Sequence, residues 1–159
     1  SIKESNSNLN HLVEEKRNID HETDSSLNAY KFDETIISLE NLEDFTNHTS
    51  FRNDSVSHKQ FINLQKMFTK SIRYEVIDLH HEKSTLSGLN ALNDFFDKCF
   101  GKITHLKIIH GKGNHSRNNF SPMRSMVRKF LLNTSIVLAF CEAELKDGGN
   151  GATYVLIKK

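Results

Sequence analysis

Glycine and proline are confined to the second half of this 159-residue chain, where all seven glycines and the single proline lie at or after Gly88. Because these residue types mark the turns of compact folds, the sequence predicts a compact domain in that half. The charge balance also changes along the chain. Residues 1–70 carry a net charge of −4 and residues 71–159 a net charge of +5. We therefore expect the two halves to have different roles.

The first half divides into two segments. Residues 1–50 are rich in Ser, Asn, Asp and Glu, and we expect a mostly disordered acidic extension that buries too little apolar area to offset the entropy of ordering. Apolar residues at helical spacing between Leu27 and Phe45 predict a short amphipathic helix, or a segment that docks on a protein partner. Residues 51–73 are predicted to hold a helix, capped by Ser57, that packs on the following domain.

The remaining segment, residues 74–159, alternates between patterns of period two and patterns of helical period. The order βαβαββ predicts an α/β two-layer sandwich with a four-stranded mixed sheet and two helices. Right-handed crossovers would place the carboxyl ends of the first three strands along one edge of the sheet. The predicted strands are 74–80, 103–110, 136–143 and 152–158, and the predicted helices are 84–100 and 121–131.

Several classes of protein are disfavoured by composition. No apolar run approaches the ~20 residues that cross a bilayer, and the amino end is polar, so we expect a cytoplasmic protein without membrane contact. Cys99 and Cys141 lie in apolar patterns and are predicted to be core thiols. No clustered Cys and His spacing indicates structural zinc.

Three loops that carry polar chemistry are predicted to meet at the common strand edge. Period-two alternation places Asp78 and His80 on one face, where the carboxylate can orient the imidazole. The turn 110–113, His-Gly-Lys-Gly, offers a base, a cation and accessible backbone N–H groups that suit a phosphate. A glycine-rich turn follows at 147–151. Each feature can also be explained as plain surface or turn geometry, and their co-location favours the functional interpretation.

The second helix adds cations to this edge. Arg124, Arg128 and Lys129 are predicted to face water, opposite an apolar stripe that faces the sheet. The expected contacts to phosphate or nucleic acid are made by Gly111, Lys112, Gly113, Arg117, Arg124, Arg128 and Gly149.

These motifs resemble those of the Smr family, the small MutS-related domain, over residues 74–159. Residues 77–80 (Ile-Asp-Leu-His) are similar to its Leu-Asp-Leu-His, and residues 109–113 carry its His-Gly-x-Gly. Residues 148–152 resemble its Gly-Gly-x-Gly-Ala ending, whereas His81 stands where the family usually has glycine. More loosely, the segment from Phe51 resembles the lead-in of stand-alone bacterial Smr proteins. The resemblance implies a fold similar to the carboxyl-terminal domain of bacterial translation initiation factor three, and nicking of DNA or RNA.

The catalytic candidates are Asp78, His80 and His110. Histidine takes up and releases protons near neutral pH, so the two imidazoles are expected to act as base and acid, with Asp78 setting the tautomer of His80. Lys112, with the N–H groups of the turn, would hold the phosphate.

The predicted cofactor is none, because a two-metal nuclease needs several carboxylates and this edge offers mainly Asp78 and Asp147. A single divalent metal ion stays open as an alternative.

Three functional classes remain. The first is an endonuclease acting on structured DNA or RNA, and the second is a non-catalytic nucleic-acid-binding or ribosome-binding module that uses the same basic edge. The third is a scaffold whose acidic extension recruits a partner. No recognition-helix pattern is present, so binding is expected to select structure rather than sequence.

Overall fold

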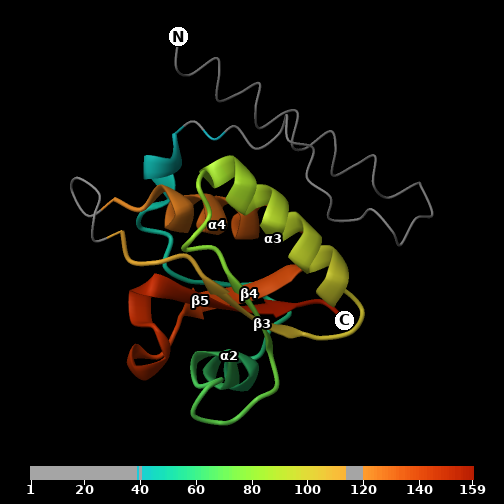
Figure 1. Ribbon diagram of the computed structural model, residues 1–159. Helices are drawn as coiled ribbons and strands as arrows, with labels where there is room; N and C mark the ends of the chain where they lie inside the picture. The colour runs from blue at the N-terminus through green and yellow to red at the C-terminus, as the bar shows by residue number, and fades with distance from the viewer. Residues whose placement is uncertain (1–38, 40, 114–119) are drawn as a thin grey trace.

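A computed structural model describes residues 39, 41–113 and 120–159 and has an α/β fold built on one mixed sheet (Figure 1). The sheet has five strands in the order β1-β4-β5-β3-β2. Three helices pack against it, and short 3-10 turns precede β1 and β5. The strands are β1 (Phe51–Arg52), β2 (Glu75–Asp78), β3 (His105–Ile109), β4 (Val137–Glu142) and β5 (Ala152–Ile157); the helices are α2 (His58–Gln65), α3 (Thr85–Cys99) and α4 (Pro122–Leu132).

The strand directions bring three carboxyl ends to one edge. β2 and β3 are parallel, and β5 lies between β3 and β4 and is antiparallel to both. β4 therefore runs in the same direction as β2 and β3, and β5 begins at the edge where those three strands end. We call this the active edge, because the candidate site residues predicted from the sequence follow these strands. The predicted meeting of the three loops is confirmed.

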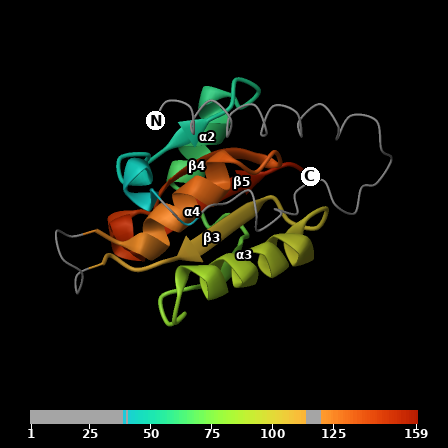
Figure 2. The ribbon, with the colours of Figure 1, turned by 90° about the horizontal axis from the view of Figure 1, so that it is seen from above.

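Helices cover both faces of the sheet. α3 and α4 lie side by side on one face and α2 lies on the other (Figures 1 and 2). Each helix begins at a serine that accepts a backbone N–H: Ser57 and Ser84 form capping boxes, and Ser121 precedes Pro122. Such caps satisfy N–H groups that have no partner within the helix. None of the described helices is long and apolar enough to span a bilayer.

The larger core lies between the sheet and the α3–α4 layer. The rings of Phe96 and Phe130 meet edge to face with centroids 5.0 Å apart, above Leu106 and Ile108 of β3. Cys99 belongs to this core, and Cys141 lies in the smaller core under α2; both are buried free thiols, as predicted.

The sheet has one strand more than the sequence predicts. In the added strand β1, Phe51 pairs with Phe140 of β4, and the two rings pack with centroids 6.1 Å apart. A two-residue strand is too short to show a period of two, so only its pairing reveals it.

A segment within the predicted acidic extension also packs on the domain. The 3-10 turn η1 (Leu42–Phe45) contacts α4, and Leu42 is buried in the larger core. Residues 1–38 and 40 of the extension, and with them most of the helix predicted at 27–45, lie outside the described residues.

This packing predicts that Leu42→Ala lowers the free energy of unfolding by about 2–3 kcal/mol, because it removes a buried leucine from the α4 layer. The matched control is Leu145→Ala, since Leu145 is 95% exposed and should change stability by less than about 0.5 kcal/mol. Urea unfolding of both variants measures the difference. Equal stabilities would mean that η1 contributes nothing to the domain.

Candidate active site

An Asp–His pair forms the first part of the active edge. Asp78 ends β2, and its carboxylate Oδ1 contacts Nδ1 of His80 and accepts the His80 backbone N–H at 3.0 Å. Both side chains are exposed. Partial burial raises the pKa of Asp78, but the hydrogen bonds from His80 outweigh that effect and hold the pKa below its usual value. An ionised carboxylate only accepts, so His80 carries its proton on Nδ1 and presents Nε2 outward.

A second exposed imidazole adjoins this pair. The rings of His80 and His81 lie with centroids 3.5 Å apart and planes tilted by 42°. His81 is not among the described non-glycine residues with positive φ, which are Asn41 and Ser71. A histidine where the family usually has glycine therefore introduces no backbone strain.

The His-Gly-Lys-Gly turn follows β3 and needs both glycines. Gly111 and Gly113 have φ values of 84° and 73°, a region that favours glycine. A Cβ on Gly113 would lie 2.7 Å from Cβ of Ser121, so the turn passes tightly against the start of α4. A Cβ on Gly111 would lie 3.6 Å from Cβ of His80, which places the turn beside the Asp–His pair.

The start of β5 holds the turn in place. The Gly151 carbonyl accepts the N–H groups of His110 at 3.1 Å and Gly111 at 3.0 Å. The Gly111 N–H predicted to bind phosphate is thus used within the fold. The exposed Lys112 side chain runs over Gly151, where an added Cβ would lie 3.0 Å from Lys112 Cγ. Gly149 lies in the same 3-10 turn, η4 (Gly149–Gly151).

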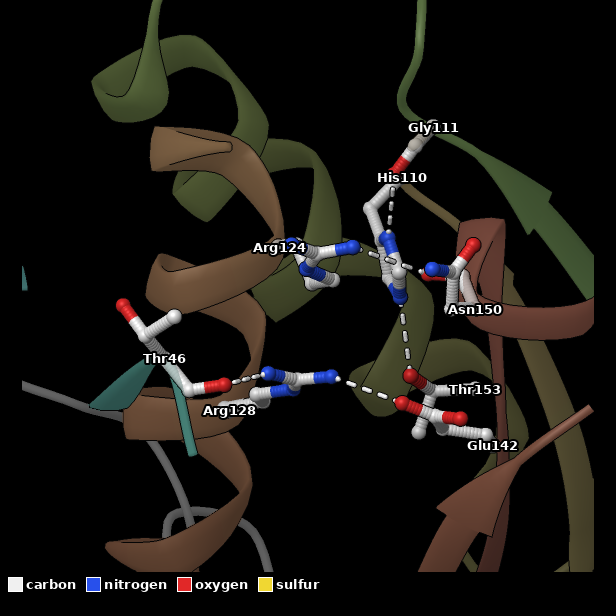
Figure 3. A network of polar contacts seen from close by, with 8 residues as sticks. All are labelled: Thr46, His110, Gly111, Arg124, Arg128, Glu142, Asn150 and Thr153. Atoms are coloured by element: carbon white, nitrogen blue, oxygen red, sulfur yellow. Dashed lines mark hydrogen bonds and ion pairs between the residues drawn. The ribbon is translucent and has the colours of Figure 1, made fainter. Parts of the chain in front are cut away.

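His110 is buried, which corrects its predicted place at an exposed strand end (Figure 3). Its Nδ1 lies 2.9 Å from the Gly111 carbonyl, which only accepts, so Nδ1 carries the proton. Nε2 then accepts from the Thr153 hydroxyl at 2.8 Å. Burial, together with the positive charges of Arg128 and Arg124, lowers the pKa of His110 to about 4. The predicted proton exchange near neutral pH is therefore wrong for this histidine.

The cations of α4 are also buried, contrary to the predicted water-facing surface. Arg128 donates to the Thr46 carbonyl and to Glu142 Oε1 at 3.3 Å, and Arg124 donates to the Asn150 carbonyl at 3.4 Å (Figure 3). Lys129 lies over the Phe45 ring, with Nζ 5.5 Å from its centroid. Helical periodicity assigns these residues to solvent because it does not register η1 and η4, which cover that face.

Asp147, the second carboxylate expected at the edge, is engaged within the fold. Its Oδ1 pairs with Lys107 Nζ at 2.7 Å and its Oδ2 accepts from the Tyr154 hydroxyl at 2.5 Å. Burial and the hydrogen bond to Asp147 raise the pKa of Tyr154. In the part of the chain that the structure describes, no three His, Cys, Asp or Glu side chains are grouped to hold a metal ion.

The segment that forms the active edge also matches a known protein family. The family model described as the Smr domain matches residues 77–158, which is more than half of the chain. The chain belongs to the Smr domain family. The matched range begins at β2 and ends after β5, so β1 and α2 lie outside it.

One relative by sequence and one by structure agree with this assignment. The chain is 37% identical over 57 residues to the probable DNA endonuclease SmrA of Escherichia coli strain K12, covering 36% of this chain and 30% of that relative. It superposes on YdaL, a stand-alone small MutS-related protein from Escherichia coli, with a TM-score of 0.58 and 25% identity, over 69% of this chain and 82% of that one. The Smr domain of Thermus thermophilus MutS2 matches at 22% identity with a TM-score of 0.46, over 54% and 99%.

The sequence prediction for this Smr domain is incomplete in two places. Thr153 is absent from the predicted site, although β5 alternation puts it on the same face as the core residue Val155, and a polar residue at a core position is a usable signal. His81 is absent as well, because the pattern favours a surface residue and only the folded turn shows its contact with His80. Arg117, predicted to bind phosphate, lies outside the described residues.

Protonation of His110 should destabilise the fold. Burial sets its folded pKa at about 4, against 6.5 for an ordinary histidine, so the stability conferred by the neutral ring is complete above pH 6.5 and is lost as the pH falls toward 4. Between pH 7 and pH 5, the wild type should lose about 2 kcal/mol of unfolding free energy more than His110→Asn does. Urea unfolding at both pH values tests this, and parallel losses would show that the imidazole is not held neutral.

Proposed function

We propose that this Smr protein is a nucleic-acid endonuclease that cleaves phosphodiester bonds by acid–base catalysis at the active edge. The observation that carries the proposal is the exposed Asp78–His80 pair, set beside the Gly111 turn and the Lys112 cation. The similarity to SmrA, which is named as a probable DNA endonuclease, supports the same reaction class.

His80 is the general base in this proposal. Its Nδ1 proton is held by Asp78, which leaves the Nε2 lone pair pointing away from the carboxylate to accept a proton from the nucleophile. Asp78 also stabilises the imidazolium that forms, since its low pKa keeps it ionised at neutral pH. A correctly placed base contributes roughly 10²–10⁴-fold to such a reaction.

Lys112 binds the phosphate. It is exposed, extends over Gly151, and follows the glycine that adjoins His80, so its ammonium can reach a phosphate that also contacts His80. A lysine acts there as a point charge on the non-bridging oxygens. His110 contributes in a different way, because its two ring hydrogen bonds fasten the turn to β5 and thereby position Lys112.

Cleavage without a metal ion fits the available carboxylates. Asp78 is committed to His80, and Asp147 to Lys107 and Tyr154. Two-metal catalysis holds its ions with several shared carboxylates. Acid–base cleavage suits RNA in particular, because the 2′-hydroxyl supplies a nucleophile within the substrate.

The decisive experiment incubates the purified chain with matched branched, single-stranded and duplex substrates of DNA and of RNA, each in EDTA and in Mg²⁺. Cleavage of RNA in EDTA supports the proposal in full, and cleavage only in Mg²⁺ replaces the acid–base route with one that uses a metal ion. Binding without any product identifies instead the non-catalytic nucleic-acid-binding or ribosome-binding module.

Replacing the base should nearly abolish turnover. We expect His80→Ala to lower the cleavage rate by at least ~10²-fold with an unchanged unfolding midpoint, because the side chain is exposed. His58→Ala, which removes an exposed histidine at the start of α2, is the matched control. Retention of more than half the wild-type rate in His80→Ala would contradict the assignment.

Replacing the phosphate-binding cation should weaken binding to all sequences alike. For Lys112→Ala, the slope of log affinity against log salt concentration should flatten by about 0.9 on duplex DNA or roughly 0.7 on a single strand. Lys98→Ala is the control, because Lys98 lies in the last turn of α3, which ends at the opposite edge of the sheet. Titrations at several salt concentrations measure both slopes, and identical slopes would remove Lys112 from the interface.

A further inference from the structure

Acid–base cleavage needs two groups that exchange protons, and the described edge leaves one of them unassigned. His80 serves as the base, but the leaving oxygen also needs a proton. His110 does not supply it, because the residue is only 3% exposed and both ring nitrogens are hydrogen-bonded within the protein. The donor must be exposed and close enough to His80 to contact the same phosphodiester.

His81 meets these requirements. It is exposed, it directly follows the base, and its ring centroid lies 3.5 Å from that of His80. The two ring planes are tilted by 42°, and both side chains are exposed, so a single phosphodiester can contact both imidazoles. We propose that His81 is the general acid of this endonuclease and donates the proton that releases the leaving oxygen.

The two imidazoles have different surroundings, and this difference assigns the role of base to His80 and the role of acid to His81. Nδ1 of His80 donates its proton to the Asp78 carboxylate, so the lone pair of Nε2 stays free to accept a proton. His81 has no such hydrogen bond from the described residues, and its charge is only the smallest of the effects that act on the pKa of Asp78. The charged groups that neighbour His81 in the described structure are Asp78 and His80, followed in sequence by Glu82 and Lys83. The carboxylate of Asp78 thus orients the base, while His81 is not hydrogen-bonded to it.

The step balances on an RNA substrate, and the inference therefore rests on the proposed function. His80 Nε2 takes the proton of the 2′-hydroxyl as the 2′-oxygen forms a bond to phosphorus. The bond from phosphorus to the 5′-oxygen breaks, and that oxygen takes the proton of His81. The products are a 2′,3′-cyclic phosphate and a 5′-hydroxyl, and proton exchange with water restores both rings.

The test compares two RNA substrates that differ in one atom. The first is an RNA with its cleavage site mapped, and the second carries sulfur in place of the leaving 5′-oxygen at that site. A thiolate has a pKa near ~8.5 and leaves without a proton donor, whereas an alkoxide does not. Loss of the general acid should therefore lower the cleavage rate of the oxygen substrate alone, while loss of the general base should lower the rate of both substrates.

We expect His81→Gln to slow cleavage of the oxygen substrate by about 10²-fold. The same variant should slow cleavage of the sulfur substrate by about 10-fold at most. His80→Gln should slow both substrates equally. A merely structural role of His81 would lower both rates together, so an equal loss overturns the inference, as does no loss. Unfolding midpoints of both variants control for folding.

The result also separates this inference from the proposed function. If the wild type cleaves RNA in EDTA but His81→Gln behaves like the wild type, the endonuclease stands and His81 is not its acid. If the wild type cleaves only in Mg²⁺, the inference fails while nuclease activity remains. If no substrate is cleaved, both fail.

Discussion

The Gly151 carbonyl joins the parts of the active edge. By accepting the N–H groups of both His110 and Gly111, it fastens the end of β3 to the start of β5. β5 in turn pairs with β4, so the loops after β3 and β4 are held at fixed positions. The hydrogen bond from the Thr153 hydroxyl to His110 joins the end of β3 to β5 a second time, on the face of the sheet that α4 covers. The exposed chemistry of the edge depends on this buried scaffold.

Two sets of polar groups divide the work. The buried set consists of residues such as His110 and Arg128, and with the half-buried Asp147 these residues make their hydrogen bonds inside the protein. Desolvation keeps His110 neutral, and polar groups removed from water need partners to be tolerated. The exposed set, formed by Asp78, His80, His81 and Lys112, stays in contact with solvent and is open to a substrate. In our proposals only the exposed set meets the phosphodiester.

The motifs predict the place of a residue better than its role. Asp78, His80 and the turn glycines lie where their positions after strands predict, because strand order and direction follow from the alternation of β and α segments. The predictions for His110 and Arg124 are wrong about exposure, since burial depends on what packs above a residue. Asn150 of η4 contacts Arg124, and Thr46 at the end of η1 contacts its neighbour Arg128; both short turns are distant from α4 in sequence and carry no periodic signal.

The sequence by itself determined the α/β class, the three capped helices, the common edge and the residues that gather there. These properties are local: they depend on periodicity, on serine caps and on glycines that tolerate positive φ. Only the tertiary structure decided which histidines are exposed to solvent and that Asp147 pairs with Lys107. It also decided that a two-residue strand extends the sheet at its edge. Solvent exposure and the choice of partners arise from contacts between distant segments, and no pattern within one segment encodes them.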